Sequence, residues 1–350
     1  MKYLQYINQL AWQQIYKTTH LENNSLSSFR LIFALFFILL YIPDYFWLKG
    51  IPDAFYRPPI FSIANFFNGF PDFSVIIFLY IILVFSLMLV VWKKYMKLSG
   101  VLVFFTFIIL SNIAFGIGKI NHSILLPISF LILSLANWKS TGKNSFLSRV
   151  PPIALIAVVL TFGMLTAGIP KALYWIDFDL NQSGFLSWFY PKYFVEGRDG
   201  LLMNMVFSLP PIILELMDYS AVFIEVISIF LLFSGNARAW KIWIITLIVF
   251  HIANILVLNI GFDSHFVVYL LFFMTQKVNL FIEKYEKVLS GFIVLIGVTQ
   301  LYLIIFTNQT IRGLIFPEFN SRMYFSLVIL SLALIFVCFQ FFNRKEKIAN

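Results

Sequence analysis

The sequence predicts an all-α fold, a polytopic transmembrane helix bundle with about nine to ten spans. Two observations lead to this prediction. Of the 350 residues, 61% are hydrophobic and 12% are charged, whereas a soluble domain averages about 25% charged residues. The apolar residues also gather in runs close to the roughly 20 residues that cross a bilayer as a helix. Because so few polar groups cannot cover the apolar surface, we expect the lipid bilayer to be the main solvent of this chain.

Before the first apolar run, residues 1–27 are expected to form an interfacial amphipathic segment. They lack the continuous apolar core and the small-residue cleavage site of a signal peptide. Apolar side chains instead recur at helical spacing, opposite two glutamines. The apolar positions are Leu4, Ile7, Ala11 and Ile15, and the glutamines are Gln9 and Gln13.

The apolar runs then follow one another along the chain, and the fourth and eighth are short enough to be re-entrant or tilted. They cover about residues 28–48, 72–92, 99–118, 122–138, 151–171, 212–234, 239–260, 262–276, 288–307 and 322–342. We assign residues 28–276 to one main transmembrane domain. Residues 277–350 are expected to add two further transmembrane helices and a basic tail.

Basic residues set the expected orientation. If every run spans the bilayer and the N-terminus is cytoplasmic, most of the 25 Lys and Arg residues lie in or beside inside connections, as the positive-inside rule requires. Both termini are therefore expected in the cytoplasm. The longest outside loop is then 172–211, which is rich in aromatic residues. The same topogenic role explains the net charge of +9, so we expect no nucleic-acid partner.

Cysteine and histidine usage argues against two kinds of site. The single cysteine, Cys338, cannot form an intramolecular disulfide. The chain has four scattered histidines, which do not have the spacing of a dedicated zinc site, so no metal is expected.

Polar residues within apolar runs are candidates for function, because a charge at mid-membrane costs about 2.5–3.5 kcal/mol on insertion scales. Asn121 and His122 lie in the hairpin between two runs, where they form either a polar turn or a pair that faces a cavity. Lys171 follows Pro170 at the end of a run. A lysine there is either a snorkelling anchor or a base, and its outside position makes an anchor less expected.

Two further constellations lie in later runs. Glu225 is surrounded by apolar residues and must find a partner or become neutral; Arg238, beyond the next turn, is a candidate for a structural polar pair with it. His251, Asn254 and Gly261 have successive helical spacings, so they are expected to share a stripe that faces protein or a cavity. The alternative to a functional site is a packing stripe with one satisfied histidine.

Four of these segments resemble motifs of one membrane-protein family. "NHSILLPISFLIL", "AGIPKALYW", "IEVISIFLLFSGNAR" and "FHIANILVLNIGF" occur in family order. Together they are similar to the membrane domain of the vitamin K-dependent γ-glutamyl carboxylase and its bacterial relatives, the horizontally transferred transmembrane (HTTM) domain proteins. The resemblance extends from about residue 28 to residue 275. It implies a bacterial cytoplasmic membrane protein with its active site toward the extracytoplasmic side.

The resemblance also implies roles for individual residues. Lys171 falls on the family's base, which deprotonates reduced vitamin K, and the oxygenated quinone then removes a γ-proton from a glutamate that adds carbon dioxide. Asn121 and His122 fall on the pair associated with carboxylation, and His251 on a histidine proposed to contact the quinone. The implied cosubstrates are a reduced quinone (vitamin K hydroquinone or menaquinol), O2 and CO2, with a secreted peptide as the substrate. The remaining candidates for quinone contact are Tyr174, Trp175 and Asn254.

Departures from the family leave a second function open. Pro170 stands where the animal enzyme has a second lysine, and the large extracytoplasmic domain of that enzyme has no counterpart after residue 276. The alternative is a non-enzymatic accessory or maturation factor that holds a small secreted peptide or lipid. A transporter is least expected, because the sequence shows neither an inverted repeat nor a matched pair of broken helices.

Overall fold

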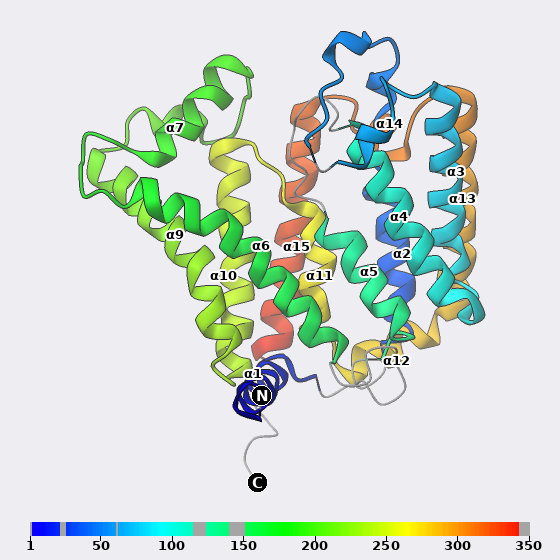
Figure 1. Ribbon diagram of the computed structural model, residues 1–350, viewed down its shortest axis with the longest axis horizontal. Helices are drawn as coiled ribbons and strands as arrows, with labels where there is room; N and C mark the ends of the chain where they lie inside the picture. The colour runs from blue at the N-terminus through cyan, green and yellow to red at the C-terminus, as the bar shows by residue number, and fades with distance from the viewer. Residues whose placement is uncertain (1, 22–25, 61, 115–123, 140–150, 343–350) are drawn as a thin grey trace. The chain divides into compact units, whose positions relative to one another are not determined.

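The computed structural model describes residues 2–21, 26–60, 62–114, 124–139 and 151–342, and no β-strand forms within these ranges (Figure 1). The all-α prediction is therefore confirmed for the described chain. Five of its helices are long and apolar enough to cross a membrane, or six if the bent pair Asp263–Leu271 and Gln276–Lys284 is one span. The five are Lys93–Ala114, Pro152–Trp175, Ala237–Leu258, Glu286–Thr307 and Ser321–Phe342.

This number is smaller than the nine to ten spans expected from the sequence, for two physical reasons. Three apolar helices are short: α2 (Phe29–Leu40), α3 (Phe73–Leu89) and α5 (Leu125–Leu135) have 12, 17 and 11 residues. The first run stops being helical at Leu40 because Pro43 follows, and the residue before a proline disfavours the helical conformation. The second reason is charge: α9 (Pro211–Leu232) is long enough, with 22 residues, but carries three carboxylates.

The chain folds into two compact units that interleave along the sequence. Unit 1 comprises Met1–Leu21, Ile153–Phe273 and Glu318–Asn350, and unit 2 comprises Glu22–Pro152 and Met274–Pro317. The helical elements of unit 1 are α1 (Lys2–Thr19), α6 (Pro152–Trp175), α7 (Gly184–Tyr190), the π-helix η6 (Pro191–Val195), α8 (Met203–Val206), α9, α10 (Ala237–Leu258), the 3-10 turn η7 (Asp263–His265), α11 (Phe266–Leu271) and α15 (Phe319–Phe342). Those of unit 2 are α2, η1 (Phe46–Leu48), η2 (Asp53–Phe55), η3 (Ile63–Phe66), α3, η4 (Lys93–Tyr95), α4 (Met96–Ala114), α5, α12 (Gln276–Lys284), α13 (Glu286–Thr307) and α14 (Ile311–Ile315).

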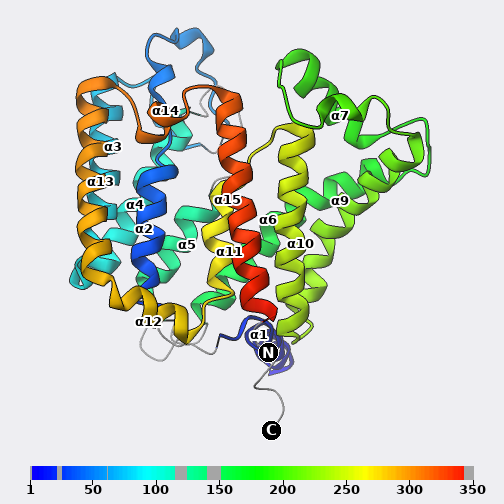
Figure 2. The same cartoon turned by 180° about the vertical axis from the view of Figure 1, so that it is seen from behind.

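In unit 1, α10 packs against both α9 and α15, and α1 contacts α9 and α10 (Figures 1 and 2). The chain reverses between α9 and α10 at Gly235, whose φ of +69° suits a residue without a Cβ. Asn236 then caps α10, because its side-chain oxygen accepts from the backbone N–H groups of Arg238 and Ala239. Helix α1 buries Ile15 but exposes Ile7, so the expected apolar stripe is divided between two environments.

In unit 2, α4 packs between α3 and α5, and α13 packs against α2 and α3. Glycines allow these close approaches, as small residues do in membrane helix pairs. A Cβ on Gly297 of α13 would lie 2.5 Å from the Met88 sulfur of α3. Aromatic side chains fill the interior: Phe33, Phe37, Phe130 and Trp138 are fully buried and pack edge-on or tilted against one another.

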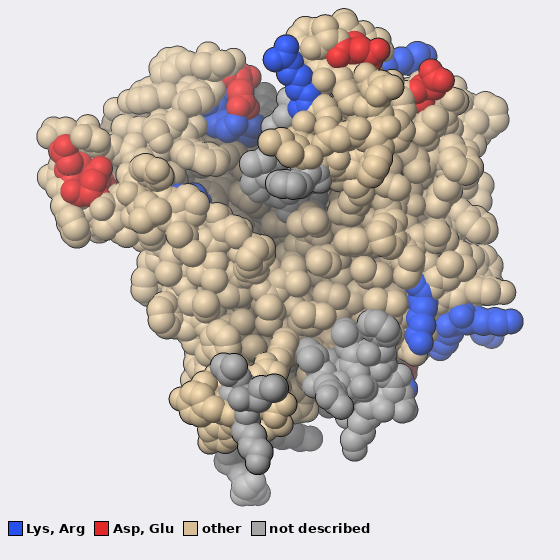
Figure 3. Space-filling model, in the orientation of Figure 1, with Lys and Arg blue, Asp and Glu red and all other residues tan. Residues whose placement is uncertain are grey.

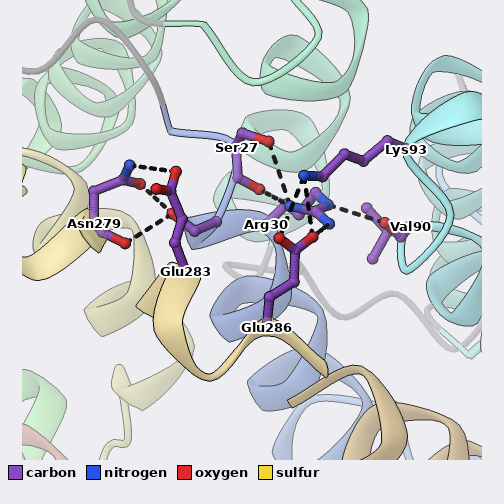
Figure 4. A network of polar contacts seen from close by, with 8 residues as sticks. Ser27, Arg30, Val90, Lys93, Asn279, Glu283 and Glu286 are labelled. Atoms are coloured by element: carbon purple, nitrogen blue, oxygen red, sulfur yellow. Dashed lines mark hydrogen bonds and ion pairs between the residues drawn. The ribbon is translucent and has the colours of Figure 1, made fainter. Parts of the chain in front are cut away.

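A polar network joins one end of unit 2 around the buried guanidinium of Arg30 (Figure 4). Arg30 Nη2 lies 2.6 Å from the Glu286 carboxylate, Nε donates to the Val90 carbonyl at 3.2 Å, and Nη1 donates to the Ser27 carbonyl. Lys93 reaches the same Glu286 carboxylate at 3.2 Å. The network therefore ties the start of α2 to the end of α3 and the start of α13.

Replacing Arg30 by methionine should destabilise unit 2 by about 3 kcal/mol, because a buried charge pair loses one partner and two carbonyls lose their donor. The measurement is the free energy of unfolding of the purified chain in an SDS titration. Lys93→Met is the matched control on the same carboxylate; its side chain is 57% exposed, so its cost should stay below about 1 kcal/mol. Equal costs for the two variants would contradict the central role of Arg30.

Candidate functional site

Lys171 lies inside helix α6, one turn before its end at Trp175. The sequence predicted that the span would end near Lys171 because of Pro170, but the helix continues past the proline. Pro170 removes one backbone donor and leaves the remaining hydrogen bonds of the last turn in place. Lys171 is consequently held on a helix that presents it to α9, instead of standing at a free end.

The Lys171 ammonium forms an ion pair and hydrogen bond with the Glu225 carboxylate of α9. The Glu225 side chain is 5% exposed and the Lys171 side chain 19%. Gly168 brings the two helices together one turn earlier, where a Cβ would lie 2.8 Å from the Glu225 Cβ. One oxygen, Glu225 Oε2, is buried with no hydrogen-bond partner among the described residues. The pair is therefore nearly dry and only partly satisfied.

The structure does not support the expected pairing of Glu225 with Arg238. Glu225 is bonded to Lys171, while the Arg238 guanidinium lies 5.9 Å from the centre of the Phe341 ring. Arg238 belongs to the first turn of α10, close to the chain reversal at Gly235. Spacing along the sequence placed Arg238 after Glu225 on the next helix, but it did not show that the preceding helix α6 brings a closer cation.

His251 of α10 is 1% exposed and lies among aromatic rings. Its Nε2 is 2.8 Å from the Tyr269 hydroxyl, and its ring stacks on Phe262 with centroids 4.4 Å apart. Nδ1 is buried with no hydrogen-bond partner in the described part of the chain. Lys171 on α6 and His251 on α10 both belong to unit 1.

Other candidates are less closely associated with Lys171. Asn254 is half-buried on α10, whereas Tyr174 is 78% exposed. Gly261 does not share a helical stripe with His251, because α10 ends at Leu258 and Asn259 takes the left-handed conformation with φ +48°. Asn121 and His122 lie outside the described residues.

Trp175 connects Lys171 to the loop predicted over residues 172–211, called the aromatic loop below. The Lys171 ammonium lies 5.3 Å from the centre of the Trp175 ring, a cation–π distance. The same ring fills the space over Gly184, the first residue of α7. Trp175 is therefore fixed between the ion pair and the start of α7.

Asp218 of α9 holds α7 in this position. Its fully buried carboxylate accepts hydrogen bonds from the Ser183 hydroxyl at 3.1 Å and from the backbone N–H groups of Gly184 and Phe185 at 2.9 and 2.6 Å. The two backbone N–H groups are among the unpaired donors at a helix start, so Asp218 acts as a cap supplied by another helix. This role was not predicted from the sequence, although an acidic residue in an apolar run is the signal that marks it.

The far end of the loop is anchored to α10. Arg198 Nη1 donates to the Asn259 carbonyl at 2.7 Å, and Asn259 Nδ2 donates to the Asp199 carbonyl at 2.6 Å. Glu196 bonds both Lys192 and Arg198. Partial burial alone would raise the pKa of Glu196, but the hydrogen bonds and charges of these two cations outweigh it and hold that pKa below its ordinary value. The loop over residues 172–211 thus has defined structure at both ends.

The described residues contain no group of three His, Cys, Asp or Glu side chains that would hold a metal ion. A scan against protein-family models, a search of curated proteins and a search of solved structures each found no match. The function of the chain must therefore be inferred from its residues and their geometry, together with the resemblance of the four sequence motifs.

A double-mutant cycle tests the ion pair. Lys171→Met and Glu225→Gln should each be strongly destabilising, by about 3 kcal/mol, because each substitution leaves the other charged group without its partner. The double variant should cost less than the sum, with a coupling free energy of at least about 1 kcal/mol in SDS unfolding. The matched control is the more exposed pair Lys192→Met and Glu196→Gln, for which coupling should remain below about 1 kcal/mol. Additive costs at Lys171 and Glu225 would show that the contact does not stabilise the fold.

Asp218→Ala should release the start of α7 by removing three acceptor contacts. We expect faster amide exchange over Gly184–Tyr190, corresponding to about 1–2 kcal/mol of lost protection. Hydrogen exchange with mass spectrometry measures this directly. The control is Asp179→Ala, on a loop carboxylate that bonds Asn181 and Gln182 instead of α7, which should leave exchange in α7 unchanged. Unaltered protection in Asp218→Ala would mean that α7 is held by its apolar packing alone.

Proposed function

We propose that this chain is a membrane enzyme in which Lys171 acts as a base on a reduced quinone, coupled to proton abstraction and carboxylation, or a related modification, of a peptide. The observation that carries the proposal is the pairing of the Lys171 amine with the buried Glu225 carboxylate between two apolar helices. The resemblance of "AGIPKALYW" to the carboxylase motif gives this lysine the role of base.

The Lys171–Glu225 pair has a physical route to a free amine. A free lysine titrates near pH 10.4, so in water its amine is almost fully protonated at neutral pH. In a dry environment two opposite charges are costly, and transfer of one proton from Nζ to the carboxylate removes both. Lys171 Nζ would then be the atom that takes up a proton from a bound hydroquinone.

The surrounding residues fit a hydroquinone. When bound, the reduced quinone together with O2 supplies the oxidising chemistry, and CO2 supplies the added carbon. His251 Nδ1 is a buried polar atom without a partner among the described residues, and it offers a hydrogen bond to a quinone oxygen. Trp175 lies beside the Lys171 ammonium and offers an aromatic face for the ring. Together these side chains orient the hydroxyl toward the base and limit access of water.

A second function is favoured by the surface of the aromatic loop. Phe178, Phe194 and Val195 are 80%, 65% and 83% exposed. Exposed apolar side chains in one loop are typical of a surface that binds a peptide or lipid. On this alternative the chain is an accessory factor that holds a small secreted peptide or lipid for a partner enzyme, and Lys171 only stabilises the fold.

Lys171→Ala should lower the rate of quinone epoxidation by about 10²–10⁴-fold, the usual contribution of a general base. The measurement is epoxide formation from menaquinol or vitamin K hydroquinone in O2, together with incorporation of labelled CO2 into peptide. Lys192→Ala in the aromatic loop is the control for loss of a lysine and should retain the wild-type rate. Wild-type turnover in folded Lys171→Ala would refute the catalytic role, and capture of a secreted peptide by that variant would then support the accessory function.

A further inference from the structure

A lysine-rich surface lies at the end of unit 2 that is organised by Arg30. Its cationic side chains are exposed and come from two chain reversals, one between α3 and α4 and one between α12 and α13. They are Lys93, Lys94 and Lys97 on the first reversal, and Lys284 and Lys287 on the second. Figure 3 shows basic side chains standing out from the surface where α3 ends and α4 begins, at the lower right.

The two reversals are adjacent, so these lysines form one surface. Lys93 reaches the Glu286 carboxylate at 3.2 Å, and Arg30 reaches it at 2.6 Å (Figure 4). The neighbouring carboxylates are already engaged within the network. Glu286 is bonded by both cations, and Glu283 accepts a hydrogen bond from Asn279 at 2.9 Å. The five lysines and Arg30 outnumber the two carboxylates, Glu283 and Glu286, so this surface keeps a net positive charge.

Helix geometry increases the attraction for anions at this end. Helices α2, α4 and α13 all begin here, and a helix start carries a partial positive charge that favours acidic groups. Neither α2 nor α4 has an acidic residue in its first turn, and Lys97 lies in that turn of α4. The acid of the first turn of α13 is Glu286, which Arg30 holds. An external anion would supply the negative charge that these helix starts lack.

Aromatic side chains identify the source of the anion. Trp92, Tyr95 and Tyr285 are 49%, 42% and 41% exposed among the lysines. Half-exposed Trp and Tyr next to Lys at the ends of apolar helices are typical of the headgroup level of a bilayer. A soluble phosphate would require the cations but not these rings.

We propose that this surface, formed by Trp92–Lys97 and Lys284–Lys287, binds the headgroups of anionic phospholipids in the adjacent leaflet. The phosphates lie against the lysines and the starts of α4 and α13, and the aromatic rings lie at the boundary with the acyl chains. This site is separate from Lys171 and does not depend on the enzymatic proposal. Because of this surface, the amount of each phospholipid that stays bound to the protein depends on the charge of its headgroup.

The test is lipid retention by the full chain after reconstitution in vesicles of equal parts POPC and POPG, followed by extraction in mild detergent and mass spectrometry of the bound lipid. Wild-type protein should retain POPG in excess of POPC. Lys94→Gln combined with Lys97→Gln should lower the POPG-to-POPC ratio by roughly 30-fold at low salt, since each lysine near an anionic surface contributes about 1 kcal/mol. Both side chains are exposed and lie outside the Arg30 network, so the variant should unfold at the wild-type denaturant concentration.

The matched control removes two cations at the opposite end of the same unit. Lys49 lies 5.4 Å from the ring of Phe73 at the start of α3, and Arg57 is exposed nearby in sequence. Lys49→Gln combined with Arg57→Gln should keep the wild-type lipid ratio. An equal loss of POPG in both double variants, or no POPG excess in wild-type protein, would overturn the proposal. Displacement of POPG by inorganic phosphate but not by chloride at equal ionic strength would also overturn it, because the ligand would then be a soluble phosphate.

Discussion

The contact between Lys171 and Glu225 fixes where α6 meets α9 in unit 1. Either charge alone would be expensive between apolar helices, so α6 and α9 must meet at the depth where both side chains can reach each other. Gly168 permits the approach from one side. On the other side, Trp243 of α10 donates its indole N–H to the Ile224 carbonyl at 2.9 Å, immediately before Glu225. The position of the carboxylate is thus fixed by both neighbouring helices.

Helix α9, which carries Glu225, also positions α7 and Trp175 beside the ion pair. Asp218 lies two turns earlier on α9 and caps α7, while the Trp175 ring lies between α7 and Lys171. A shift of α9 would therefore move the carboxylate and the cover together. The apolar side of α7 adds to this constraint, since Phe185 and Phe189 pack in one cluster with Leu214 of α9 and Leu258 of α10. Order in the loop and geometry at the ion pair are consequently linked.

The sequence predicted the parts of this arrangement that depend on local pattern. Apolar runs identified the helices, and the cost of isolated charges identified Lys171 and Glu225 as residues that need an explanation. The pairing itself depends on which helices are neighbours. Glu225 lies fourteen residues after the start of α9, whereas Lys171 lies only four residues before the end of α6. Matching residues at equal distances from these two helix ends would therefore not have paired them. The first turns of α9 instead extend along α7. This placement follows from the Asp218 cap and cannot be predicted from the periodicity of the sequence.

The difference in span count has a related cause. Hydropathy measures the composition of a run but not where its helix stops. Thus a run of suitable length near residues 28–48 yields a helix of 12 residues. An apolar helix such as α9 can carry three carboxylates because Lys171 of α6 pairs with one of them and the start of α7 donates hydrogen bonds to another.

Two charge networks among the described residues, around Arg30 and around Glu225, differ in how fully their hydrogen bonds are satisfied. Around Arg30, the guanidinium donates to one carboxylate and two carbonyls, and a second cation shares that carboxylate. A network with its donors and acceptors satisfied is rigid and favours one protonation state. Around Glu225, one carboxylate oxygen is bonded and the other is not, and a buried imidazole nearby also has one nitrogen without a partner among the described residues. Buried polar groups left in this state have hydrogen-bonding capacity to spare, which the proposed quinone would use. The Arg30 network is therefore suited to holding helices together, whereas the Lys171 pair is the contact on which the proposed proton transfer depends.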